Sequence, residues 1–92
     1  MFLGKRIKEL RIEKGMVQRQ LAAALEVDSP MYSKIERGER KAKREQVIAL
    51  ARIFEVDADE LLILWLAGQV YEIVEDESVA KEALEFVTGK LK

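Results

Sequence analysis

Apolar residues recur every three or four positions along most of this chain, a spacing that is typical of amphipathic α-helices. The pattern predicts a first helix over residues 4–14, which Gly15 is placed to end, and a second over residues 18–25. No stretch of five or more residues alternates between apolar and polar side chains as a half-buried strand does. We therefore expect an all-α fold.

Helix-capping residues refine this pattern and mark the next two helices. A third helix is expected over residues 30–37, with Pro30 at its first position, Ser29 as its N-cap and Gly38 just beyond its end. The fourth is expected over residues 45–54, where apolar side chains again share one face.

Two more helices are expected in the C-terminal third. Asp57, with Glu60 three residues later, is typical of a capping box and opens a fifth helix that reaches Val74. A sixth is predicted over residues 79–87. Because 92 residues suffice for one domain and a short appendage, we expect a compact five-helix domain at residues 1–66 and a helical extension at residues 67–92.

The composition excludes several classes of chemistry. The chain has no cysteine and no histidine, so disulfides, zinc-finger ligands, cysteine nucleophiles and histidine bases are absent. The carboxylates fall on helix faces expected to be solvated, and no glycine-rich phosphate loop is present. We expect no enzyme activity, no cofactor, no metal ion and, without a separate ligand domain, no small-molecule ligand.

Membrane association is not expected either. The longest apolar run, residues 61–67, is far shorter than the roughly 20 residues that cross a bilayer. The N-terminus lacks the apolar core of a signal peptide. These features predict a cytoplasmic protein.

Charge is distributed unevenly along the chain. Residues 1–44 contain 12 Lys/Arg and 6 Asp/Glu, a net of +6, whereas residues 45–92 contain 4 and 11, a net of −7, and the two sum to the total of −1. Such asymmetry indicates an N-terminal face for polyanions and a C-terminal region kept away from them.

The second and third predicted helices have the scale of a helix-turn-helix. Each spans eight residues, and Glu26-Val27-Asp28 joins them in a tight turn. Such a unit lays its second helix in the major groove of DNA. The basic segment Glu39-Arg-Lys-Ala-Lys-Arg44 follows directly, where it is expected to lie along the phosphates.

The residues here carry a family resemblance. The stretch Gln18-Arg-Gln-Leu-Ala-Ala-Ala-Leu-Glu-Val-Asp-Ser-Pro-Met-Tyr-Ser-Lys-Ile-Glu-Arg-Gly38 resembles the lambda-repressor/Cro type of regulator, the XRE family. The match continues through Val47-Ile-Ala-Leu-Ala-Arg-Ile-Phe-Glu-Val-Asp57 and covers about two-thirds of the chain. The resemblance implies a lambda-repressor-like fold and binding to double-stranded DNA. Glu26 stands where the family usually has glycine, so either Glu26 adopts the left-handed conformation or the turn differs slightly.

The resemblance also implies roles for individual residues. Gln18 is expected to touch a phosphate and brace the second motif helix, with N-terminal capping as the alternative. Lys34 is the candidate for a guanine contact, and Asp28 either accepts from a cytosine or caps the helix. Tyr32 is expected in the core with its hydroxyl at the surface. The full set of expected DNA-binding residues is Gln18, Arg19, Ser29, Pro30, Ser33, Lys34, Arg37, Arg40, Lys41, Lys43 and Arg44.

A structural ion pair is implied between Arg11 and Glu36. In the family this partly buried pair links the first and third helices. Removing one partner of a truly buried pair costs about 3–5 kcal/mol.

Apolar residues in the C-terminal third exceed what a four-helix core needs. They indicate either a homodimer interface or a sixth helix that folds back on its own domain. The expected interface residues are Leu64, Trp65, Val70, Tyr71, Val74 and Phe86. The favoured function is a transcriptional regulator that binds a (pseudo)palindromic operator as a homodimer. The alternative is an antitoxin-type interaction module whose C-terminal helices bind a partner protein.

Overall fold

The computed structural model describes residues 2–92, which form six α-helices and no strand. The helices are α1 (Phe2–Glu13), α2 (Gln18–Ala24), α3 (Ser29–Glu36), α4 (Arg44–Phe54), α5 (Ala58–Val74) and α6 (Ala80–Thr88). The all-α prediction is confirmed, and the predicted boundaries agree to within two residues. The fifth helix crosses the predicted domain boundary after residue 66 without a break.

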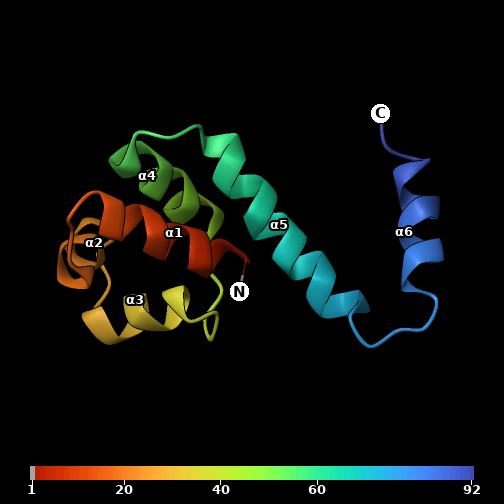
Figure 1. The fold of residues 1–92 in the computed structure, drawn as a ribbon, viewed down its shortest axis with the longest axis horizontal. Coiled ribbons are helices and arrows are strands. Elements are labelled where there is room, and N and C mark those ends of the chain that lie inside the picture. The colour runs from red at the N-terminus through yellow and green to blue at the C-terminus, as the bar shows by residue number, and fades with distance from the viewer. Residues whose placement is uncertain (1) are drawn as a thin grey trace.

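A core built from the first five helices fixes their arrangement. Its fully buried members come from every one of these helices: Ile7, Leu21, Tyr32, Val47, Leu50, Phe54 and Leu61. Helix α1 packs against α3, α4 and α5, so it lies at the centre of the bundle (Figure 1). The ion pair between Arg6 Nε and Glu60 Oε2, at 2.9 Å, joins α1 to the start of α5.

Gly4 permits the closest helix contact of the core. A Cβ atom at this position would lie 2.3 Å from the backbone oxygen of Glu36. Only glycine therefore allows α1 to approach the C-terminal end of α3 this closely. This contact sets the position of α1 beside the helix-turn-helix.

The Ser29 cap and the Asp57–Glu60 capping box were predicted wrongly, whereas the capping alternative for Asp28 is confirmed. Asp28, not Ser29, is the N-cap of α3, and its Oδ1 accepts a hydrogen bond from the Met31 amide at 2.8 Å. A carboxylate is the stronger acceptor beside the positive end of a helix. Asp57 caps α5 by accepting from the Asp59 amide at 3.0 Å, but Glu60 does not complete a capping box because it pairs with Arg6.

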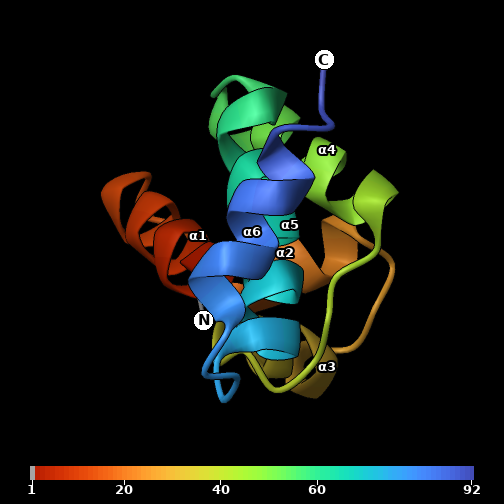
Figure 2. The same cartoon turned by 90° about the vertical axis from the view of Figure 1, so that its right-hand side faces the viewer.

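Helix α6 stands apart from the other five (Figure 1). None of its residues is buried, and no major helix–helix contact of residues 2–92 involves it. In the view turned by 90°, α6 lies in front of α5 and overlaps it (Figure 2). The alternative in which the sixth helix folds back on its own domain is therefore wrong, because the segment after α5 holds this helix away from the bundle.

No helix within residues 2–92 is both long enough and apolar enough to span a bilayer.

Candidate nucleic-acid interface

The turn between α2 and α3 has a fixed backbone. Glu26 adopts the left-handed conformation, with φ of 59°, where a non-glycine residue is strained by about 1 kcal/mol. The Val27 amide donates to the Ala22 carbonyl at 3.0 Å, which closes the end of α2. Glu26 thus takes the conformation that glycine usually supplies, and the turn keeps its geometry.

Helix α3 turns one face to the core and the other to solvent. Tyr32 and Ile35 are buried, whereas Ser29, Pro30 and Lys34 are exposed. The outward face offers the Lys34 ammonium, the Ser29 hydroxyl and an apolar proline ring to any molecule that lies against it.

Two predicted contact residues of α3 are already engaged within the chain. Ser33 is half-buried, and its Oγ accepts a short hydrogen bond from Arg37 Nη1. Arg37 Nε also pairs with Glu39 Oε2 at 2.8 Å. The hydrogen bond between Arg37 and Glu39, together with their opposite charges, raises the pKa of Arg37 and lowers the pKa of Glu39.

A buried polar network fixes α3 against α1 and α2. Glu36 receives hydrogen bonds from Arg11 Nε at 2.7 Å, Arg11 Nη2 at 3.1 Å and Gln18 Nε2 at 3.0 Å. The Glu36 side chain is 2% exposed and the Arg11 side chain 14%. Gln18 therefore braces α3 through its side chain, and the buried Glu36 carboxylate is well satisfied.

The pKa of Glu36 reflects two opposing causes. Burial alone raises the pKa of this carboxyl. The hydrogen bonds from Arg11 and Gln18 and the positive charge of Arg11 outweigh that burial, so the pKa lies below its ordinary value. Glu36 is therefore ionised at neutral pH.

Tyr32 lies close to this network but differs from its prediction. Its side chain is fully buried, and its hydroxyl has no hydrogen-bond partner among the described residues. Burial raises the pKa of Tyr32. The expectation of a hydroxyl at the surface is wrong, because the whole side chain, hydroxyl included, is buried in the core.

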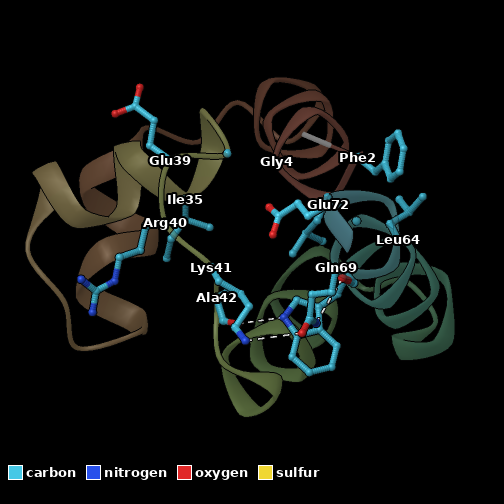
Figure 3. A pocket seen from close by; sticks show the side chains of 14 residues that line it. Phe2, Gly4, Ile35, Glu39, Arg40, Lys41, Ala42, Leu64, Gln69 and Glu72 are labelled. Carbon is cyan, nitrogen blue, oxygen red and sulfur yellow. Dashed lines mark hydrogen bonds between the residues drawn. The ribbon is translucent and has the colours of Figure 1, made fainter. Parts of the chain in front are cut away.

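The basic segment at residues 39–44, here called the basic connector, points its side chains in two directions. Lys41 Nζ donates to Gln69 Oε1 at 3.4 Å, and the Trp65 indole N–H donates to the Ala42 carbonyl at 2.8 Å, so α5 holds this stretch of backbone. Figure 3 shows Lys41 directed toward Gln69 at the edge of a hollow of about 300 Å³, whereas Arg40 extends away from it.

The other cations of the connector and of α2 are open to solvent. Arg19, Arg40, Lys43 and Arg44 are exposed, and none forms a salt bridge among residues 2–92. Lys43 is the N-cap of α4 and Arg44 its first residue. Their positive charge therefore adds to that of the helix N-terminus.

Two lysines that the sequence analysis missed lie beside α3. Lys5 and Lys8 line a shallow hollow of about 530 Å³ together with Ser33 and Arg37, with the Glu36 network next to it. They come from α1, which reaches this position through the close contact at Gly4. A glycine in the first turn of a helix was the available signal, since it indicates a close helix contact.

The expected interface residues fall into two groups. Leu64 and Trp65 are half-buried and pack against the core of their own chain. Val70, Tyr71 and Phe86 are exposed and Val74 is half-buried. The Tyr71 ring lies 5.5 Å from that of Phe2, which is also partly exposed.

An outward-facing helix, positioned by a tight turn and a buried ion pair and surrounded by exposed cations, defines a helix-turn-helix domain. Comparison with known proteins agrees. Residues 7–61, more than half of the chain, match the helix-turn-helix protein family, and the chain belongs to that family. The predicted recognition and the lambda-repressor-like fold are thereby confirmed, and DNA is the partner that the family implies.

A solved structure supports the same fold over most of the chain. The chain is similar to the clp gene regulator ClgR from Corynebacterium glutamicum, with 25% sequence identity and a TM-score of 0.61. The similarity covers 92% of this chain and 84% of that one. No curated protein sequence matches the chain.

Proposed function

We propose that this protein is a transcriptional regulator that binds a (pseudo)palindromic operator in double-stranded DNA as a homodimer. The observation that carries the proposal is the exposed face of α3. The Arg11–Glu36–Gln18 network holds this helix in place, and exposed cations lie near it. Similarity to a gene regulator supports it.

Base recognition is assigned to the outward face of α3. Lys34 donates to O6 and N7 of a guanine in the major groove. The Ser29 hydroxyl donates to or accepts from a base edge, and the Pro30 ring contacts a thymine methyl group. Ser33 supports this face through its hydrogen bond with Arg37 and contacts DNA from a half-buried position.

Phosphate binding is assigned to cations around that helix. Lys5 and Lys8 flank the C-terminal end of α3 on one side, and the cations of the connector lie beyond it. The remaining members of the set are the neutral amide of Gln18 and the cations Arg19, Arg37, Arg40, Lys41, Lys43 and Arg44. Because each neutralised phosphate releases counterions, binding depends steeply on salt concentration.

Dimerisation supplies the specificity that one unit lacks. A single α3 presents only a few base-reading groups, which restricts it to a few base pairs. Two copies related by a twofold axis read half-sites about 34 Å apart on one face of the duplex. The exposed members of the expected interface, including Val70 and Phe86, provide the apolar surface for this association.

Selection of bound duplexes from a random pool, at a fixed salt concentration, tests the proposal. The expected product is an inverted repeat whose half-sites are centred about 10 base pairs apart. The Lys34→Ala variant serves as the matched control, because it should lose preference at one position of each half-site. Enrichment of no sequence, or of a single unrepeated half-site bound by a monomer, would contradict the proposal.

A further inference from the structure

Helix α5 carries along its length an apolar stripe that no other part of residues 2–92 covers. Ile63, Leu66, Val70 and Ile73, here called the α5 seam, recur at intervals of three, four and three residues. This is the spacing by which one helix presents a continuous line to another. Ile63 and Ile73 are 65% and 76% exposed, so the seam is open to solvent along its length.

Helix α6 carries a second uncovered apolar surface. Ala80, Ala83, Leu84 and Val87, here called the α6 face, follow the i, i+3, i+4, i+7 spacing of one helix side. Glu82 and Glu85 occupy the opposite side. An amphipathic helix of nine residues is too short to be stable alone and depends on packing of its apolar face.

The two surfaces do not meet within one chain. The segment after α5 is held in turns, with the Glu77 amide donating to the Val74 carbonyl at 2.9 Å and the Ala80 amide to the Glu77 carbonyl at 3.2 Å. These turns direct α6 away from α5 (Figure 1). Each chain therefore contains one uncovered seam and one uncovered helix face.

The exposed area matches what an interface between two copies requires. The chain exposes 6632 Å², whereas a compact protein of 10.5 kDa exposes about 5,400 Å². The excess, about 1,200 Å², exceeds the roughly 800 Å² that each partner contributes to a standard stable interface. Likewise the radius of gyration is 14.7 Å, against about 12 Å for a compact chain of this length.

Charge decides which surfaces pair. Residues 58–79, which include α5, contain six acidic residues and no basic one, a net of −6. Pairing α5 with α5 of a second copy would bring two such segments together. Helix α6 itself contains Lys81, Glu82 and Glu85, a net of −1, and residues 89–92 add Lys90 and Lys92. Pairing α6 with α5 therefore brings much less negative charge together than pairing α5 with α5.

We propose that α6 of one protomer docks its apolar face on the α5 seam of a second copy, and that the second copy returns the same contact. One exchange of α6 covers both uncovered surfaces of both chains, and the twofold symmetry closes the dimer. This inference rests on the proposed homodimer and names the surfaces that form it.

Disulfide trapping tests the exchange, because the chain has no cysteine of its own. A tagged Val87→Cys chain is co-expressed in turn with untagged Ile63→Cys, Leu66→Cys, Val70→Cys and Ile73→Cys chains, so every register along the seam is sampled. After oxidation, non-reducing electrophoresis separates tagged–untagged disulfide dimers from other products. Ile12→Cys on α1, an apolar position that is 61% exposed, is the matched control.

The expected result is a disulfide between the tagged α6 and one or two seam positions of the untagged chain, and none with Ile12→Cys. A Val70→Cys/Val87→Cys double variant should likewise give a covalent dimer. Two results would overturn the exchange while leaving the homodimer intact: disulfides only between two seam positions, or only between two α6 helices. A double variant that closes internally as a monomer would show that α6 packs on its own α5. A monomer in light scattering at high micromolar concentration would overturn both proposals.

Discussion

The indole N–H of Trp65 donates a hydrogen bond to the carbonyl oxygen of Ala42 over 2.8 Å. This bond joins α5 to the basic connector that follows α3. Gln69, one turn further along α5, accepts from Lys41 at 3.4 Å and donates to the Trp65 carbonyl at 3.3 Å. The helix that carries the α5 seam therefore also positions the backbone that presents Arg40 and Lys43.

Replacing Trp65 with Phe tests this connection. Phenylalanine preserves an aromatic ring in the half-buried site but lacks the N–H, so the Ala42 carbonyl loses its partner. We expect a loss of about 1–2 kcal/mol in the free energy of unfolding and weaker DNA binding. Thermal unfolding and a DNA titration measure the two effects. Tyr71→Phe, which removes an exposed hydroxyl from the same helix, should change neither, and equal effects in both variants would contradict the assignment.

The sequence was sufficient to predict elements whose signals are local. Helical periodicity and the cap-and-glycine pattern around α3 located the helix-turn-helix. The left-handed conformation of Glu26 was one of two alternatives, and it came from the family resemblance, since the family usually has glycine at this position. The Arg11–Glu36 pair spans 25 residues and was likewise expected only from the family resemblance.

Other features depend on how helices meet, which periodicity does not specify. Lys5 and Lys8 belong to the candidate interface only because α1 crosses the end of α3 at Gly4. Trp65 counted as surplus apolar surface until its hydrogen bond placed it against the connector. The position of α6 follows from turns of the 75–79 segment, where Val79 is the N-cap and no side chain makes a capping hydrogen bond.

Gly4 should tolerate no side chain. In Gly4→Ala the added Cβ would lie 2.3 Å from the Glu36 backbone oxygen, so α1 and α3 must separate. We expect a loss of at least about 1–3 kcal/mol in the free energy of unfolding, as for other overpacked contacts. Gly68→Ala is the matched control, since its Cβ meets only a Phe2 ring carbon at 3.9 Å. That variant should be stabilised by about 0.5–1 kcal/mol, because alanine favours a helix interior. Urea unfolding of both variants decides between these outcomes.

Lys5 and Lys8 should contribute affinity without sequence preference. Replacing both with alanine removes two phosphate-neutralising charges, so the slope of log K against log salt should become shallower by about 2. Affinities for operator and random DNA should fall by the same factor. Fluorescence titrations at several salt concentrations provide both numbers. The Lys81→Ala/Lys90→Ala variant removes the same amount of charge from α6 and the residues just after it, and it should leave the slope unaltered. An equal change of slope in that variant would contradict a specific contribution of the α1 lysines.

Lys34 should behave in the opposite way. Its replacement by alanine removes the proposed guanine contact, which is worth about 1–3 kcal/mol of discrimination between bases. We expect weaker operator binding, relaxed preference at one base pair of each half-site, and a small change on random DNA. Repeating the random-pool selection with this variant measures the preference directly. If the base preference were unaltered, Lys34 would not contact the guanine, and another residue would recognise that base pair of the half-site.

Glu36 should govern stability and its response to acid. The carboxylate is almost fully buried and holds three hydrogen bonds from Arg11 and Gln18. In Glu36→Ala the Arg11 guanidinium loses its partner, and we expect a loss of about 3–5 kcal/mol in the free energy of unfolding, or a fall in Tm of about 12 °C or more. The base preference of whatever protein remains folded should be unchanged, because Glu36 faces the core.

The pH dependence follows from the sign of the pKa shift. The pKa of Glu36 lies below the ordinary value of 4.5 in the folded protein, so the unfolded chain binds the proton more readily. The contribution of Glu36 to stability is therefore fully present above about pH 4.5 and declines as the pH falls through the lower, folded pKa. In Glu36→Gln this part of the acid response should disappear, leaving a shallower loss of stability below pH 4.5. Glu13→Gln, which replaces an exposed carboxylate of α1, is the control and should follow the unmodified protein. Identical acid unfolding curves for Glu36→Gln and the unmodified protein would contradict the assignment of this buried carboxylate as the group that responds.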